Sequence, residues 1–67
     1  MDTFNEKLKQ LRQETAQSQQ YVANAVGITR SAYANYEQGL REPDLATLKK
    51  LCIYFGVSAD YLLGIDN

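Results

Sequence analysis

The chain has 67 residues, a formal net charge of −1 at pH 7 and a hydrophobic fraction of 45%, which together indicate one small globular domain. It contains one cysteine and no histidine, which excludes an internal disulfide, a zinc site built from Cys and His, and a His-based catalytic triad. The sequence shows neither a long apolar run nor a signal-peptide pattern, so we expect a cytoplasmic protein without a membrane span.

The first predicted helix covers residues 4–14. Thr3 and Glu6 have the spacing of a capping box, in which a hydroxyl and a carboxylate each satisfy a free amide of the first turn. Helical periodicity then places three apolar side chains on one face: Phe4, Leu8 and Leu11. We therefore expect this helix to begin after Thr3 and to bury that face.

A second helix is predicted to begin after Ser18, because serine is a good N-cap residue. Its inward side chains are Val22, Ala23 and Val26. Gly27 follows, and glycine readily adopts the positive φ that ends a helix. The chain then passes through one short turn into the next helix.

The third predicted helix follows another N-cap residue, Thr29, and covers residues 30–38, with Tyr33 and Tyr36 as its apolar positions. The turn before it is too short for antiparallel packing. The second and third helices should therefore cross steeply, as in a helix-turn-helix over residues 19–38. This arrangement leaves four residues on the outer face of the third helix: Arg30, Ser31, Ala34 and Asn35.

Asp44 is the predicted cap of a fourth helix, whose apolar stripe should face inward: Leu45, Leu48, Leu51, Cys52 and Phe55. Gly56 ends this helix, and Ser58 caps a short last helix, ADYLL, that stops at Gly64. The apolar spacing is helical throughout, without sustained strand-like alternation. The sequence thus predicts a single all-α domain over residues 1–67, a compact bundle of five helices in which Cys52 is a small buried hydrophobe.

The whole ordered pattern resembles a known family. The segments SQQYVANAVGITRSAYANYEQG and LREPDLATLKKLCIYFGVSADYLLG are similar to the Cro-type helix-turn-helix family of phage and bacterial repressors, which has the lambda-repressor-like fold. The resemblance covers about Phe4 to Gly64. Its matching features are Ser18-Gln19, the Ala23 and Gly27 pair, Glu37, Pro43-Asp44 and VSADYLLG.

In that family the third helix lies in the major groove, with its N-terminal residues at base edges. The resemblance assigns base reading to Arg30, Ser31, Ala34 and Asn35, with Thr29 and Tyr33 at the margin. Arg30 has the donors to bind O6 and N7 of guanine, and the Asn35 carboxamide suits adenine. The methyl group of Ala34 suits the methyl group of thymine.

The resemblance also implies phosphate contacts and a structural ion pair. Ser18 and Gln19, where the second helix begins, match the family's phosphate-binding start of that helix, which its amides and dipole assist. Gln38 and Arg41 are further phosphate candidates. Arg12 and Glu37 match a pair in which an arginine of the first helix holds the end of the third.

Four residues depart from the family pattern. Tyr33 stands where Ile or Val is usual, so a core position and a DNA contact through its hydroxyl both stay open. Gln17 replaces a common apolar residue, which predicts a looser entry into the second helix. Leu40 replaces a frequent lysine, and Glu42 adds a negative charge beside Arg41. Phosphate affinity should then be low, which makes dimerisation more important.

The resemblance implies a sequence-specific transcriptional regulator, a repressor that binds a palindromic operator of double-stranded DNA as a homodimer. The expected dimer surface consists of residues of the last helix and the tail: Tyr61, Leu62, Leu63 and Ile65. The alternative role for these residues is to close the helical bundle. The rival function is an antitoxin-like or coactivator-like protein-interaction module, in which the face from Arg30 to Asn35 would be occluded. No titratable pair has catalytic spacing, so we expect no enzyme, cofactor, metal or small-molecule substrate.

Overall fold

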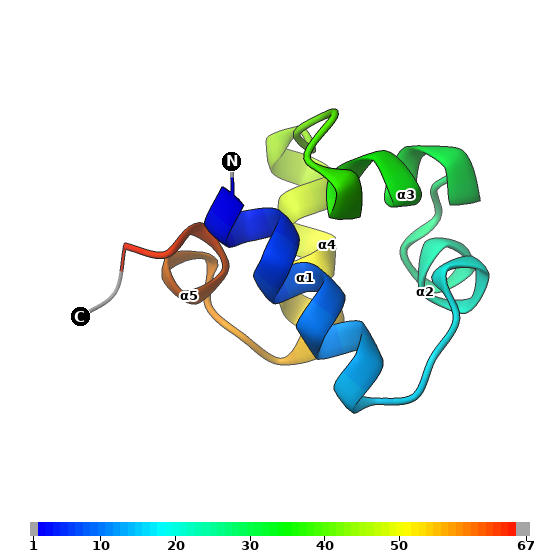
Figure 1. The fold of residues 1–67 in the computed structure, drawn as a ribbon, viewed down its shortest axis with the longest axis horizontal. Coiled ribbons are helices and arrows are strands. Elements are labelled where there is room, and N and C mark those ends of the chain that lie inside the picture. The colour runs from blue at the N-terminus through cyan, green and yellow to red at the C-terminus, as the bar shows by residue number, and fades with distance from the viewer. Residues whose placement is uncertain (1, 66–67) are drawn as a thin grey trace.

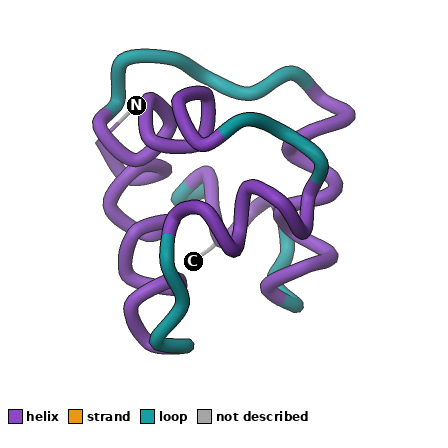
Figure 2. Tube along the Cα trace, turned by 90° about the vertical axis from the view of Figure 1, so that its right-hand side faces the viewer, coloured by secondary structure: helices purple, strands orange, loops and turns teal. Residues whose placement is uncertain are grey.

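A computed structural model describes residues 2–65; Met1, Asp66 and Asn67, which belong to the predicted domain, lie outside the described residues. Its five helices are α1 (Asp2–Glu14), α2 (Gln19–Val26), α3 (Arg30–Gln38), α4 (Leu45–Phe55) and α5 (Ala59–Leu63) (Figure 1). Within residues 2–65 short loops join the helices and no strand occurs (Figure 2). The predicted all-α bundle of five helices is confirmed.

Polar side chains begin four of the helices where the sequence predicts them. The oxygen of each capping side chain accepts a hydrogen bond from an amide three residues on, at 2.8–3.1 Å, which satisfies one of the free amides of the first turn. These caps are Ser18, Thr29, Asp44 and Ser58. The boundaries of α2 to α5 therefore follow from local side-chain chemistry.

The predicted capping box of the first helix is wrong. Because α1 begins at Asp2, Thr3 lies inside its first turn and is not an N-cap. The Thr3 side chain instead packs against α5, where a Cβ added to Gly64 would come within 2.5 Å of Thr3 Cγ2. Packing between the ends of α1 and α5 thus takes the place of the predicted cap.

The turn between α1 and α2 contains the one non-glycine residue with positive φ among residues 2–65, Ala16, at φ 56°. The amide of Ala16 donates to the carbonyl of Gln13 (3.0 Å), and that of Gln17 donates to the carbonyl of Arg12 (3.3 Å). This is the hydrogen-bond pattern of a Schellman motif, whose left-handed position usually holds glycine. Here alanine holds it at a cost in backbone strain.

Every helix contributes to one hydrophobic core. Its buried members are Phe4, Leu8, Val22, Ala23, Val26, Tyr33, Tyr36, Leu51 and Leu62. Most of the predicted stripe of α4 packs on this core, but Leu45 is 83% exposed, so its predicted inward orientation is wrong. Leu45 is the first residue of α4, and it lies beside the loop that enters the helix instead of above the core.

α1 contacts α3 and α5, while α4 contacts α2 and α5. In Figure 1, α3 runs across the view and α2 is seen nearly end-on, as expected for two helices that cross steeply. Ala23 is fully buried in α2, and α2 and α3 are in direct contact. A small residue at this position lets the two helices approach closely, which fixes the direction in which α3 faces outward.

Candidate nucleic-acid interface

The outer face of α3 carries the four residues that the resemblance assigns to base reading. Arg30 and Ser31 are exposed, and Ala34 and Asn35 are half-buried. Their spacing places them on one side of the helix. The opposite side of α3 is buried: Tyr33, Tyr36 and Glu37. The core thus holds one side of the helix and leaves the other open to a partner.

The two marginal positions differ. Thr29 is exposed, and its Oγ1 accepts the amide hydrogen of Ala32 at 3.1 Å, so its own hydroxyl hydrogen remains available as a donor. Tyr33 is fully buried, which makes its assignment to base reading wrong. Its ring occupies a core position between α3 and the rest of the bundle, where DNA has no access.

The hydroxyl of Tyr33 is buried and has no hydrogen-bond partner among residues 2–65. It lies beside Arg12 and Glu37, whose charges act on it. Burial raises the pKa of the Tyr33 phenol far above its usual value, so the group stays neutral. A buried polar group without a partner costs folding free energy.

The N-termini of α2 and α3 are suited to negatively charged ligands. Both helices begin at hydroxyl caps, Ser18 and Thr29, and neither has an acidic residue in its first turn. Free amides and the helix dipole give such ends a partial positive charge. From Thr15 to Tyr36, Arg30 is the only charged residue in the sequence, so no carboxylate on this stretch opposes an anion.

Gln38 and Arg41 are exposed at and beyond the C-terminal end of α3. The carbonyl of Asn35 accepts the amide hydrogens of Leu40 (2.9 Å) and Arg41 (3.4 Å), which ties the following loop to the helix. Leu40 is 69% exposed and Glu42 is also exposed. The surface at the C-terminal end of α3 thus combines positive, negative and apolar side chains, unlike the surface at the N-termini of α2 and α3.

Arg12 and Glu37 form a close ion pair that joins α1 to α3. Arg12 Nε donates to Glu37 Oε2 at 2.6 Å, and Arg12 Nη2 donates to Glu37 Oε1 at 3.0 Å. The two side chains are 15% and 3% exposed, respectively. Burial alone would raise the pKa of Glu37, but the hydrogen bonds from its neighbours, that of Arg12 foremost, lower it. Glu37 is therefore ionised at neutral pH.

Gln19 belongs to the same cluster, because its Nε2 donates to Glu37 Oε1 at 3.1 Å. Arg12 also donates, through Nη1, to the carbonyl of Gln17 at 3.0 Å. Side chains from α1, α2 and α3 thus meet at the start of α2. Sequence reasoning placed Gln19 at a phosphate and Glu37 in an ion pair, but it missed the bond between them.

The sequence also missed the role of Gln17. Its Oε1 accepts a hydrogen bond from the Tyr54 hydroxyl at 2.6 Å, which joins the α1–α2 turn to α4. The predicted looser entry into α2 is therefore wrong, because a polar bond replaces the apolar contact of the family pattern. No feature near Gln17 in the sequence indicates a partner 37 residues away.

The expected dimer residues occupy different environments. Leu62 is fully buried in the core, so its assignment to a dimer surface is wrong. Tyr61 is half-buried, and the Lys7 ammonium lies 4.2 Å from the centre of its ring and donates to its carbonyl at 3.0 Å. Leu63 is half-buried, and Ile65 is 66% exposed. The end of α5 therefore keeps part of the expected apolar surface.

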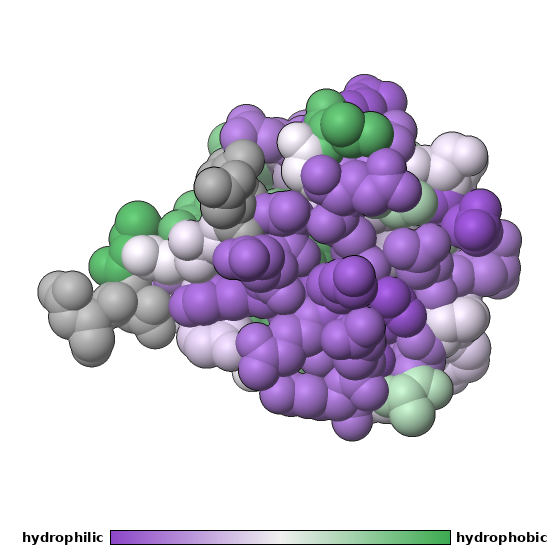
Figure 3. Space-filling view, in the orientation of Figure 1, coloured by the Kyte–Doolittle hydropathy of each residue, from purple (hydrophilic) through white to green (hydrophobic). Residues whose placement is uncertain are grey.

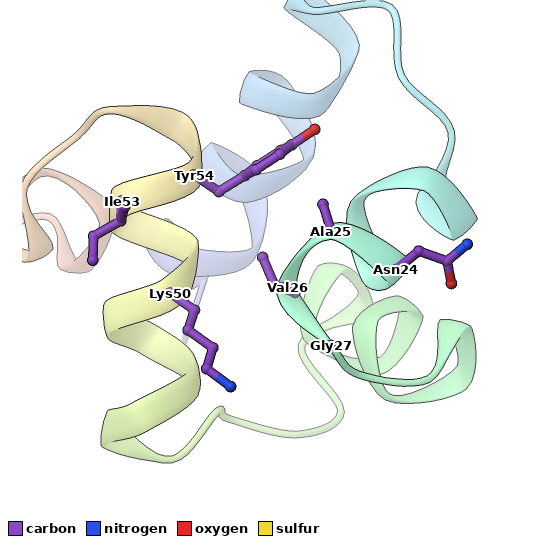
Figure 4. A pocket seen from close by; sticks show the side chains of 7 residues that line it. All are labelled: Asn24, Ala25, Val26, Gly27, Lys50, Ile53 and Tyr54. Carbon is purple, nitrogen blue, oxygen red and sulfur yellow. The ribbon is translucent and has the colours of Figure 1, made fainter.

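The surface in Figure 3 is mainly hydrophilic, with hydrophobic areas at its upper and left edges. An apolar hollow of about 190 Å³ is lined by Phe4, Glu42, Pro43, Leu45, Leu48 and Leu63. A larger groove of about 490 Å³ separates α2 from α4, and Lys50 reaches along it toward the turn at Gly27 (Figure 4). No group of His, Cys, Asp and Glu side chains suited to a metal ion occurs in the described part of the chain.

Comparison with known proteins gives one family match. The family described as Helix-turn-helix matches residues 8–62. The SPbeta prophage-derived HTH-type transcriptional regulator YonR of Bacillus subtilis (strain 168) is 52% identical over 60 residues, which are 90% of this chain and 56% of YonR. The Cryptic phage CTXphi transcriptional repressor RstR of Vibrio cholerae is 39% identical over 54 residues, 81% of this chain and 49% of RstR.

A third relative, the HTH-type transcriptional activator BcrR of Enterococcus faecalis, is 37% identical over 60 residues, 90% of this chain and 29% of BcrR. The chain spans about half the length of YonR and RstR. No solved structure matches it. These relatives are named as regulators of transcription, in line with the expectation of a regulator and not an enzyme. No described helix is long and apolar enough to cross a membrane.

Proposed function

The chain belongs to the Cro-type helix-turn-helix family, and from this premise we propose that it binds operator DNA as a sequence-specific transcriptional regulator. In this proposal α3 lies in the major groove and reads base edges with its outer face. The observation that carries the proposal is the two-sided character of α3. Its inner side is buried, while the outer face of Arg30, Ser31, Ala34 and Asn35 is open.

The open face offers donors and acceptors that match base edges. The Arg30 guanidinium suits guanine, and the Asn35 carboxamide suits adenine, each through two hydrogen bonds. Ser31 and Thr29 supply hydroxyls, and Ala34 supplies a methyl group. In the rival protein-interaction module a protein partner would cover this face instead.

Phosphate binding is proposed at both ends of this surface. At the start of α2, Ser18 and Gln19 lie beside free helix amides and no acidic residue of the first turn. At the other end, Gln38 and Arg41 are exposed. Few positive charges are involved, so affinity should depend less on salt than for a basic domain, since the slope of log K against log salt scales with the number of neutralised phosphates.

We further propose that two copies bind a palindromic operator, with half-sites about 34–36 Å apart. One copy of a 67-residue domain reads few base pairs, so a dimer is needed for useful specificity. With Leu62 in the core, the expected dimer residues that remain are Tyr61, Leu63 and Ile65. Leu63 lines the hollow of about 190 Å³ together with the exposed Leu45, which extends this apolar surface. Substituting Leu45→Glu should reduce dimerisation in sedimentation, whereas Ile53→Glu, on an exposed position of the same helix, should not.

Repression is the proposed direction of regulation, since two of the relatives come from phage elements and one of these is named a repressor. A regulator that acts on bacterial operators works in the cytoplasm.

The central experiment selects the bound duplexes from random DNA and then compares variants by gel shift. Arg30→Ala should lose about 1–3 kcal/mol of binding and relax specificity at one base position. Lys9→Ala, which removes a positive charge from the exposed side of α1, is the matched control and should bind like the parent. Failure of the folded protein to enrich any sequence, or equal losses for the two variants, would refute the proposed reading face.

A further inference from the structure

We propose that Glu37 is a positioning residue for DNA binding: it holds the carboxamide of Gln19 in the orientation that a backbone phosphate requires. The inference rests on the proposed function and assigns a task to a buried carboxylate that does not itself reach DNA. The ion pair with Arg12 would then serve two purposes, the packing of α1 on α3 and the alignment of a contact at the start of α2.

Glu37 receives three hydrogen bonds, and one of its oxygens is shared. Oε2 accepts from Arg12 Nε, while Oε1 accepts from both Arg12 Nη2 and Gln19 Nε2. The Glu37 side chain is 3% exposed and is thereby fixed in place. A fixed oxygen beside the first residue of α2 gives the Gln19 side chain one favoured position.

The chemistry of the partners fixes which end of the carboxamide faces which way. An ionised carboxylate only accepts hydrogen bonds, so the nitrogen of Gln19 must face Glu37 and its oxygen must face elsewhere. Gln19 Nε2 has two hydrogens, and the bond to Glu37 uses one. The second is left for a phosphate oxygen, which is also an acceptor. A rotated carboxamide would present its oxygen to the phosphate and repel it.

The backbone at the start of α2 is held by the same cluster. Arg12 Nη1 donates to the carbonyl of Gln17, two residues before Gln19. The cap residue Ser18 stands between them and accepts from the amide of Tyr21. Both the side chain of Gln19 and the turn that carries it are thus set before DNA arrives. Pre-ordering of this kind improves affinity because less side-chain freedom is lost on binding.

The first test uses the free protein and needs no DNA. The side-chain amide of Gln19 should be ordered in NMR relaxation, with an order parameter approaching the value of about 0.85 typical of rigid backbone. The exposed carboxamide of Gln38 is the internal reference and should be much more mobile. Equal mobility of the two carboxamides would overturn the positioning role, whatever the protein does with DNA.

The second test is a double-mutant cycle on the duplex selected by the parent protein. Arg12→Met combined with Glu37→Met removes the charge pair as a unit, and such replacements often leave the fold intact. This paired variant should weaken binding about two- to tenfold, the loss expected from freeing one side chain. In a Gln19→Ala background the same pair of substitutions should change affinity less than about twofold.

A merely structural role gives a different outcome. If the pair weakened binding equally with and without Gln19, Glu37 would act through the fold as a whole and the inference would fail. Gln10→Ala is the matched control: it removes an exposed glutamine of α1 whose side chain donates to Glu14, and it should leave affinity unchanged. If the unmutated protein bound no DNA, the proposed function would be rejected, while the NMR test would still decide whether Glu37 orders the Gln19 carboxamide.

Discussion

Breaking the Arg12–Glu37 pair from one side should destabilise the domain severely. Glu37→Gln keeps the size of the side chain but leaves the guanidinium of Arg12, 15% exposed, without its counter-charge. Removing one partner of a buried pair costs about 3–5 kcal/mol. A domain of 67 residues has a total unfolding free energy of about 3–10 kcal/mol at 0.05–0.15 kcal/mol per residue. The variant should therefore retain little folding stability at 37 °C.

Urea unfolding followed by far-ultraviolet circular dichroism measures this loss directly. The matched control is Glu14→Gln, the same chemical change at an exposed residue of α1 that accepts a hydrogen bond from Gln10. It should cost less than about 0.5 kcal/mol, as surface substitutions usually do. The reasoning is refuted if Glu37→Gln is no more destabilising than Glu14→Gln, because the pair would then behave as a solvent-exposed one.

Three further outcomes are expected. Ala16→Gly should stabilise the fold by about 0.5–1 kcal/mol, raising the melting temperature, because glycine tolerates φ 56° without strain; Ala25→Gly inside α2 should destabilise it by a similar amount. Tyr33→Phe should maintain or raise stability in urea, since it removes a buried hydroxyl without a partner among residues 2–65. The lowered pKa of Glu37 means that its contribution to folding stability is fully present above its unfolded pKa of about 4.3 and is lost as pH falls through its folded pKa. The urea unfolding midpoint, measured from pH 7 to 2, should therefore fall less in the Arg12→Met, Glu37→Met variant than in the parent protein.

Local chemistry made the helices predictable. Ser18, Thr29, Asp44 and Ser58 cap helices where their residue type and position indicate, because an N-cap bond joins groups only three residues apart. The outward side of α3 followed from the same local logic, once Tyr36 and the turn at Gly27 fixed which side is buried, whereas base reading by that side comes from the family resemblance and stays a prediction. Both inferences depend on neighbours in sequence and on nothing remote.

Contacts between distant residues were beyond the sequence. The bond from Tyr54 to Gln17 spans 37 residues, and nothing in either residue type specifies the other. Leu62 was placed on a dimer surface because apolar residues at the chain end exceeded the expected core, yet the structure buries Leu62 and exposes Leu45 instead. Tyr33 could be assigned only when the depth of the core beneath α3 was known. Helical periodicity gives the side of a helix, but it does not say how deep its neighbours lie.

The acidic net charge of the chain and its proposed affinity for DNA are compatible because of where the charges are neutralised. Glu37 is the one carboxylate of α3, and inside the fold it accepts three hydrogen bonds from Arg12 and Gln19. A buried, paired carboxylate contributes little repulsion to a phosphate outside. In the proposed complex, the exposed side of the stretch from Thr15 to Tyr36 presents Arg30 as its only charge, assisted by two helix N-termini. Hydrogen-bond geometry must therefore supply the discrimination that bulk charge cannot, and a network that holds Gln19 in place is the kind of device such a surface needs.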